Sequence, residues 1–155
     1  ITSTAMVVSY FNSLKSEPAI KPPGVAQWLL DNNFRDDKTN SSTGATCDGV
    51  THEAIRAAGL HLGNLTRAEE ASDLSVLKDW LAGGPVILHV RARPASPGGC
   101  KFTNHGHYIV ATGVLAPGDR YSINDPASAS PARAEGTAEE IEKGCLLVGL
   151  IRMRP

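Results

Sequence analysis

The chain has 155 residues, of which 41% are hydrophobic and 20% are charged, and its formal net charge is −1. These values are typical of one soluble globular domain with a sizeable core. A net charge so close to zero excludes a general basic attraction to nucleic acid or anionic lipid. No stretch approaches the roughly eighteen consecutive apolar residues of a membrane helix. We therefore expect a single domain over residues 1–155, with no nucleic-acid partner and no membrane span.

Helical patterns dominate the first part of the chain. Apolar residues at helical spacing predict a helix over Thr2 to Leu14. A second helix is expected after the Pro22-Pro23-Gly24 turn. A third helix should begin at an N-cap, either Asp48 or Thr51, and end at Gly59.

The pattern changes to strands in the second part. A short strand is expected at 62–65, and a helix capped by Ser72 or Asp73 should end at the Gly83-Gly84-Pro85 turn. Residues 128–143 have a loop-like composition. Further strands are predicted at 85–90, 107–114, 120–124 and 145–153. This order predicts an α+β fold in which N-terminal helices pack on an antiparallel sheet.

Three cysteines, Cys47, Cys100 and Cys145, limit the chain to one internal disulfide. Cys145 begins an apolar strand, so we expect it to be buried. Their spacings do not match a zinc site, and we expect neither a metal nor another cofactor. Both a reducing compartment and a lightly bridged secreted protein are compatible with this count.

The most informative pair of polar residues is His107 and Asp125. His107 begins one predicted strand and Asp125 ends the next, so an antiparallel hairpin would place them side by side. A carboxylate in that position can fix the tautomer of the imidazole, which leaves the other ring nitrogen to face a nucleophile. We expect a ring nitrogen of His107 about 3 Å from Asp125. The simpler alternative is a surface histidine and a turn aspartate.

The remaining histidines carry weaker signals. His105 and His107 would share a strand face as a metal pair, but no third ligand accompanies them. His89 is expected to face solvent or a polar contact, whereas His52 and His61 are expected at the surface.

Several motifs resemble those of the C39-like peptidases within the papain-like superfamily of cysteine peptidases. The first is a Gly-His-aromatic strand followed by a strand that ends in Asn-Asp-Pro, found here at 104–113 and 121–126. The helix, glycine turn and Pro-Val strand at 77–87 resemble the same family, and the opening at 2–10 resembles the helix after its Cys-Gly-Pro-Thr-Ser motif. The resemblance implies a papain-like fold in which His107 is the base and Asp125 orients it.

The nucleophile of that family is missing from the sequence. If Thr2 and Ser3 align with the Thr-Ser of the motif, the cysteine falls two residues before Ile1, and Ile1 should lie at the first helix and face His107. Cys47 is the alternative nucleophile, because the order Cys47, His107, Asp125 resembles the NlpC/P60 branch of the superfamily. Cys47 could instead be structural, for example bridged to Cys100.

The resemblance implies a thiol-dependent hydrolase that cleaves a peptide or a peptidoglycan-type amide. Relatives include bacterial processing peptidases and secreted toxins or effectors, so an inhibitor or immunity protein is an expected partner. Location outside the cytoplasm, or within a larger exported or transporter protein, is slightly favoured. The alternatives are a papain-like binding module without activity, and a deamidase, acyltransferase or NlpC/P60-like amidase that uses the same residues.

Overall fold

A computed structural model of the chain describes residues 1–34, 50–93 and 99–155. Its helices are α1 (Thr2–Leu14), α2 (Pro22–Asp31), α3 (His52–Leu62) and α4 (Leu77–Leu81), with short turns η1 (Leu74–Val76), η2 (Pro131–Arg133) and η3 (Glu140–Gly144). Its strands are β1 (Arg67–Ala71), β2 (Val86–Ala92), β3 (Gly106–Leu115), β4 (Arg120–Asn124), β5 (Glu135–Thr137) and β6 (Cys145–Arg154). The expected α+β layout is confirmed.

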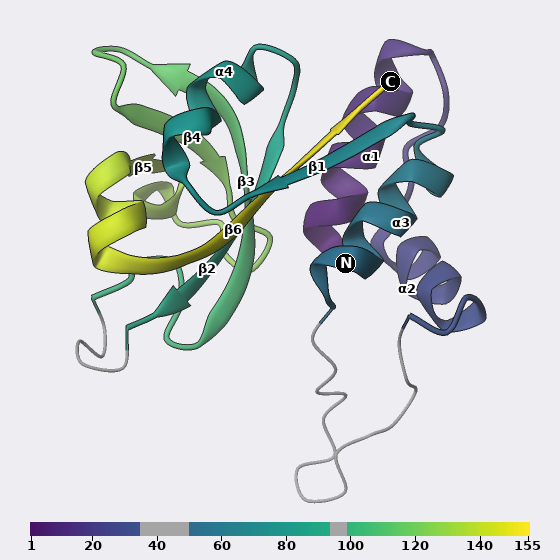
Figure 1. Cartoon of the computed structure of the whole chain (residues 1–155), viewed down its shortest axis with the longest axis horizontal. Coiled ribbons are helices and arrows are strands. Elements are labelled where there is room, and N and C mark those ends of the chain that lie inside the picture. The colour runs from purple at the N-terminus through teal and green to yellow at the C-terminus, as the bar shows by residue number, and fades with distance from the viewer. Residues whose placement is uncertain (35–49, 94–98) are drawn as a thin grey trace, which may run out of the picture.

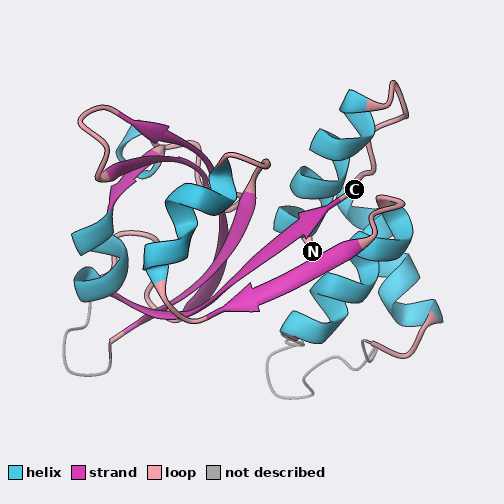
Figure 2. Ribbon diagram, turned by 45° about the horizontal axis from the view of Figure 1, so that its top comes forward, coloured by secondary structure: helices cyan, strands magenta, loops and turns pink. Residues whose placement is uncertain are grey.

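The strands form one antiparallel sheet in the order β1-β6-β2-β3-β4-β5. The last strand in sequence, β6, therefore lies between β1 and β2. Figure 1 shows α1, α2 and α3 grouped on one side of the molecule, with α4 and the curved part of the sheet on the other. Figure 2 shows the strand that ends at the C-terminus running toward the helices.

The central strand β2 is buried on both faces of the sheet. Leu88 and Val90 face a core cluster that includes residues of α4 and η3, whereas Ile87 faces a cluster with Val7 of α1 and Ile55 of α3. A strand covered on both faces has a continuous apolar sequence instead of an alternating one, which explains the run PVILHV. This packing holds α1 against β2 and β3, the strands that carry the polar residues discussed below.

The first helix occupies the predicted range, and the second begins slightly earlier than expected. Helix α2 includes Pro22 and Pro23 in its first turn, where a missing N–H costs no intrahelical hydrogen bond. Thr51 is the N-cap of α3, and its hydroxyl accepts a hydrogen bond from the Ala54 amide at 3.2 Å.

Two predicted boundaries are wrong. Helix α3 continues through Gly59 to Leu62 and is capped by Gly63. A Cβ on Gly59 would overlap the sulfur of Met153, so this glycine permits α3 to approach β6 and does not end the helix. The strand expected at 62–65 lies instead at Arg67–Ala71, where it pairs with β6.

Two further segments differ from the sequence-based prediction. The helix expected after Asp73 is divided into η1 and α4, and the Asp73 carboxylate accepts from the Ser75 amide at 2.8 Å. The loop-like residues 128–143 contain η2, β5 and most of η3. Among the described residues, no helix combines the length and the apolarity needed to cross a bilayer.

A disulfide joins Cys100 to Cys145, and both residues are buried. This pairing contradicts a bridge between Cys47 and Cys100. Cys47 itself lies outside the described residues. The bond connects the segment that leads into β3 with the first residue of β6, so it fixes the approach to His107.

Replacing both bridged cysteines by serine should destabilise the fold. The disulfide closes a loop with a sequence separation of 45 residues, and such a bond is worth about 2–4 kcal/mol because it restricts the unfolded chain. We expect the urea midpoint of Cys100→Ser/Cys145→Ser to fall accordingly relative to the wild type. A bridge that survives Cys145→Ser in non-reducing peptide mapping would contradict this pairing.

Candidate active site

His107 and Asp125 are in contact, as the hairpin geometry predicted. His107 is the second residue of β3, and Asp125 directly follows β4, which pairs with β3. The distance between His107 Nε2 and Asp125 Oδ1 is 2.7 Å. The His107 side chain is 18% exposed and that of Asp125 is 1% exposed. The contact is therefore formed at the edge of the core, with the carboxylate inside and the imidazole toward the surface.

Asp125 is held by two further interactions at its buried carboxylate. The Ala127 amide donates to Oδ1 at 2.9 Å, and Nη1 of Arg133 approaches Oδ2 at 3.1 Å. Nε of Arg133 donates to the carbonyl of Lys101 at 2.7 Å, which fixes the guanidinium. Arg133 lies in η2, inside the segment predicted to be a loop, and no sequence motif indicated that it would reach Asp125.

This arrangement determines which nitrogen of His107 is free to react. Nε2 is engaged by the carboxylate, so Nδ1 is the nitrogen left for another partner. Asp125 is acceptor-only when ionised, and its donors hold its oxygens in position. His107 is therefore restricted in both tautomer and ring orientation.

The N-terminal turn of α1 lies beside β3, the strand that carries His107. The Ser3 hydroxyl donates to the Tyr108 carbonyl at 2.7 Å, and Ser3 is only 2% exposed. A cavity of about 360 Å³ opens between these elements. Its described lining residues are Ile1, Thr2, Ser3, Val50, His89, Gly106, His107, Tyr108 and Pro126.

Ile1 occupies the position that the motif alignment predicted. It is the N-cap of α1 and lines the same cavity as His107. The N-terminus of a helix carries a partial positive charge, which stabilises an anion such as a thiolate.

A second polar group borders the same cavity and was not anticipated. His52 was expected at the surface, but its side chain is only 17% exposed, because Nδ1 contacts Glu70 Oε1 at 2.5 Å and Nε2 contacts Nδ1 of His89 at 2.9 Å. The ring of His89 stacks on that of Tyr108 with centroids 4.2 Å apart. The polar contact expected for His89 is thus present, with His52 as the partner.

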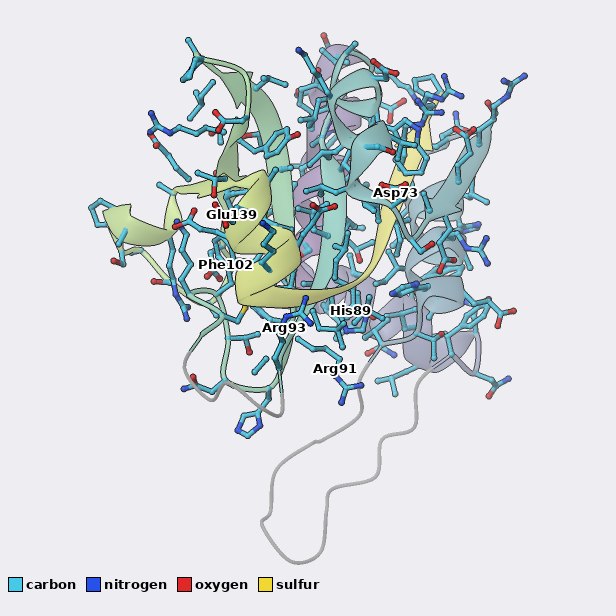
Figure 3. All side chains as sticks on the ribbon, turned by 60° about the vertical axis from the view of Figure 1, so that its left-hand side comes forward. Asp73, His89, Arg91, Arg93, Phe102 and Glu139 are labelled. Atoms are coloured by element: carbon cyan, nitrogen blue, oxygen red, sulfur yellow. A yellow bond between two sulfur atoms is a disulfide. The ribbon has the colours of Figure 1, made fainter. Side chains whose placement is uncertain are left out.

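The environment displaces two pKa values in this group. Burial, with smaller contributions from His52 and Arg91, lowers the pKa of His89 from its ordinary value of 6.5 to about 4. Figure 3 shows His89 and Arg91 at the same end of β2. Burial, with a smaller contribution from Glu70, raises the pKa of Tyr108 to about 12. The Tyr108 hydroxyl also donates to the Val50 carbonyl at 2.7 Å, so the phenol remains protonated.

The other sequence candidates lie elsewhere. His105 is exposed, and no group of three potential metal ligands gathers in residues 1–34, 50–93 and 99–155. His61 is exposed as expected, and its ring stacks on Trp28 at 5.2 Å. Cys47, the alternative nucleophile, is outside the described residues, so the structure does not place it against His107.

Comparison with known proteins identifies the family. Residues 1–144 match the model of the Peptidase_C39 like family. The chain therefore belongs to this family, and its helices and antiparallel sheet are compatible with a papain-like fold. Membership supports a hydrolase of the cysteine-peptidase type in general. No curated protein and no solved structure gives a significant match.

Removing the guanidinium of Arg133 should destabilise the protein by leaving the Asp125 carboxylate without its cationic partner. We expect Arg133→Met to cost about 1–3 kcal/mol in chemical denaturation, because a buried charged acceptor loses a donor. The matched control is Lys143→Met, which breaks an exposed pair with Glu139 and should change stability by less than about 0.5 kcal/mol. Equal effects of the two changes would contradict the role assigned to Arg133.

The lowered pKa of His89 predicts a contribution to acid sensitivity. The unfolded chain binds a proton at this residue near its ordinary pKa of 6.5, whereas the folded protein binds it only near 4. Stability should therefore fall as the pH decreases from about 6.5 to 4, because protons favour the unfolded state. Melting temperatures of the wild type should decline more steeply over this range than those of His89→Phe. Parallel curves would contradict the prediction.

Proposed function

We propose that the protein is a thiol-dependent peptidase or amidase in which His107 is the general base and acid, Asp125 orients it, and a cysteine two residues before Ile1 is the nucleophile. The observation that carries the proposal is the buried contact of 2.7 Å between His107 Nε2 and Asp125 Oδ1, which leaves Nδ1 for the thiol. The cavity that contains His107 also contains Ile1, so a residue just ahead of Ile1 would enter it.

The chemistry follows from these positions. His107 Nδ1 takes the thiol proton, and the thiolate attacks the carbonyl carbon of the amide to form a carbon–sulfur bond. The carbon–nitrogen bond then breaks, and the imidazolium returns its proton to the leaving amine. In the second half, a water molecule gives a proton to His107 and attacks the thioester, which releases the acid and regenerates the thiol. No cofactor enters these steps.

The substrate class proposed is a peptide or a peptidoglycan-type amide, and the name of the family supports the peptide. The cavity is lined by two histidines and by three hydroxyl residues, Thr2, Ser3 and Tyr108, which can form hydrogen bonds with an amide substrate. An inhibitor or immunity protein as partner, and a location outside the cytoplasm, belong to the same proposal. The disulfide supports the location outside the cytoplasm, because such bonds persist in oxidising compartments.

Adding Cys-Gly in front of Ile1 should produce a thiol-dependent activity. We expect the extended chain to hydrolyse fluorescein-labelled casein or purified peptidoglycan, and to be labelled rapidly by iodoacetamide at the added cysteine. His107→Ala should lower turnover by several orders of magnitude, because the thiol loses its base and its proton donor. Asp125→Asn should reduce turnover less severely, because only orientation is lost.

The control chain carries Ser-Gly in place of Cys-Gly and should be inactive. Melting curves of every variant show whether an effect arises from unfolding. Rapid, His107-dependent labelling of Cys47 in the chain as it stands would instead favour the NlpC/P60-like amidase. An extended chain that folds, yet shows neither labelling above that of a free thiol nor hydrolysis, would indicate a binding module. Product analysis distinguishes hydrolysis from deamidation or acyl transfer.

A further inference from the structure

The second polar group of the cavity forms a continuous line of hydrogen bonds. It runs from Glu70 on β1 through His52 on α3 to His89 on β2, with contacts of 2.5 Å and 2.9 Å. The three residues come from three separate elements and end at the cavity wall. The chemistry proposed for His107 makes no use of them.

The positions of the protons along this line can be followed residue by residue. The Glu70 carboxylate only accepts, so His52 donates to it from Nδ1. A neutral His52 then has an unprotonated Nε2, which accepts from Nδ1–H of His89. A neutral His89 that is protonated at Nδ1 has a bare Nε2. The carboxylate of Glu70 therefore determines the tautomers of both imidazole rings, and it leaves Nε2 of His89 as a hydrogen-bond acceptor.

The surroundings of His89 hold its ring and place its Nε2 beside Gly106, a residue without a side chain. Its ring lies against Tyr108 at an interplanar angle of 25°. Gly149 is paired with His89 across β6, and a Cβ there would lie 2.8 Å from Cε1 of His52, so only a glycine leaves room for that ring. On the cavity side, a Cβ built on Gly106 would lie 3.9 Å from His89 Nε2. Gly106 and His89 both line the cavity, so this nitrogen is directed to its wall.

We propose that His89 is a substrate-binding residue whose Nε2 accepts a hydrogen bond from an N–H or O–H group of the substrate, and that His52 and Glu70 are positioning residues that fix this acceptor form. The identity of the bound group as part of an amide substrate rests on the proposed function, but the acceptor form does not. The ligand class is an amide or hydroxyl compound with a free N–H or O–H group. An acceptor atom on the ligand would be repelled by the lone pair of His89 Nε2.

The first experiment determines the tautomer directly in the chain as it stands. Long-range proton–nitrogen NMR spectra of the histidine-labelled protein at pH 8 should show His89 protonated at Nδ1 and bare at Nε2. His52→Phe should shift His89 toward the Nε2-protonated form. Glu70→Leu should do the same, and Glu70→Gln should restore the wild-type spectrum because the amide oxygen still accepts. His105→Gln, at an exposed position, is the control. A wild-type His89 protonated at Nε2 would overturn the proposal.

The second experiment tests binding with two probes that differ by one donor. N-methylacetamide has an N–H group, whereas N,N-dimethylacetamide has none. The first should move the Nε2 resonance of His89 and the second should not. Equal shifts, or no shift with either probe, would overturn the binding role while leaving the peptidase proposal intact.

The third experiment uses the chain extended by Cys-Gly and the fluorogenic peptide that it cleaves best from a random library. His89→Phe keeps an aromatic ring against Tyr108 and removes Nε2. It should raise KM about tenfold, the contribution of one hydrogen bond, with little change in kcat. Methylating the amide nitrogen that His89 binds should weaken the wild type similarly and leave His89→Phe unaffected. If every methylated peptide affects both enzymes equally, the binding role is wrong. If no peptide is cleaved, the peptidase proposal fails and the two NMR experiments still decide the role of His89.

Discussion

The hydrogen bond from the Ser3 hydroxyl to the Tyr108 carbonyl, at 2.7 Å, is the contact on which the arrangement of the site depends. It joins the first turn of α1 to β3, the strand that carries His107, across a sequence separation of 105 residues. Because Ser3 is buried, the bond is shielded from competing water. Together with the apolar packing of Val7 and Phe11 against the sheet, it holds α1 beside the strand that carries His107.

Tyr108 gives the same strand a second function. Its carbonyl accepts the hydrogen bond from Ser3 of α1, and its hydroxyl donates to the Val50 carbonyl ahead of α3. Its ring stacks on that of His89. Successive strand residues point to opposite faces of a sheet, but at this end of β3 both His107 and Tyr108 line the cavity. One short segment thereby connects the carboxylate–imidazole pair with the packing of the helices.

The sequence predicted those parts of the fold that local patterns determine. Helix α1 and strands β2, β3 and β4 follow from apolar periodicity and turn residues, and the contact of His107 with Asp125 follows from the hairpin. Strand β1 was misplaced because its sequence, RAEEA, is polar, and only its pairing with β6 makes it a strand. Arg133 and His52 were missed for the same reason, since their partners are distant in sequence and brought near by tertiary packing.

The place of β6 in the sheet has a consequence for synthesis on the ribosome. Strand β1 leaves the ribosome long before β6, its neighbour in the sheet. Cys100 likewise cannot form its disulfide until Cys145 has been synthesised. The helices and the hairpin of β3 and β4 can form while translation proceeds, because their contacts are local. Strands β1 and β2 each pair with β6, so they cannot be connected in one sheet before residues 145–154 emerge. The nascent chain therefore carries an unpaired strand edge until translation reaches β6, and during this interval a chaperone could bind that edge.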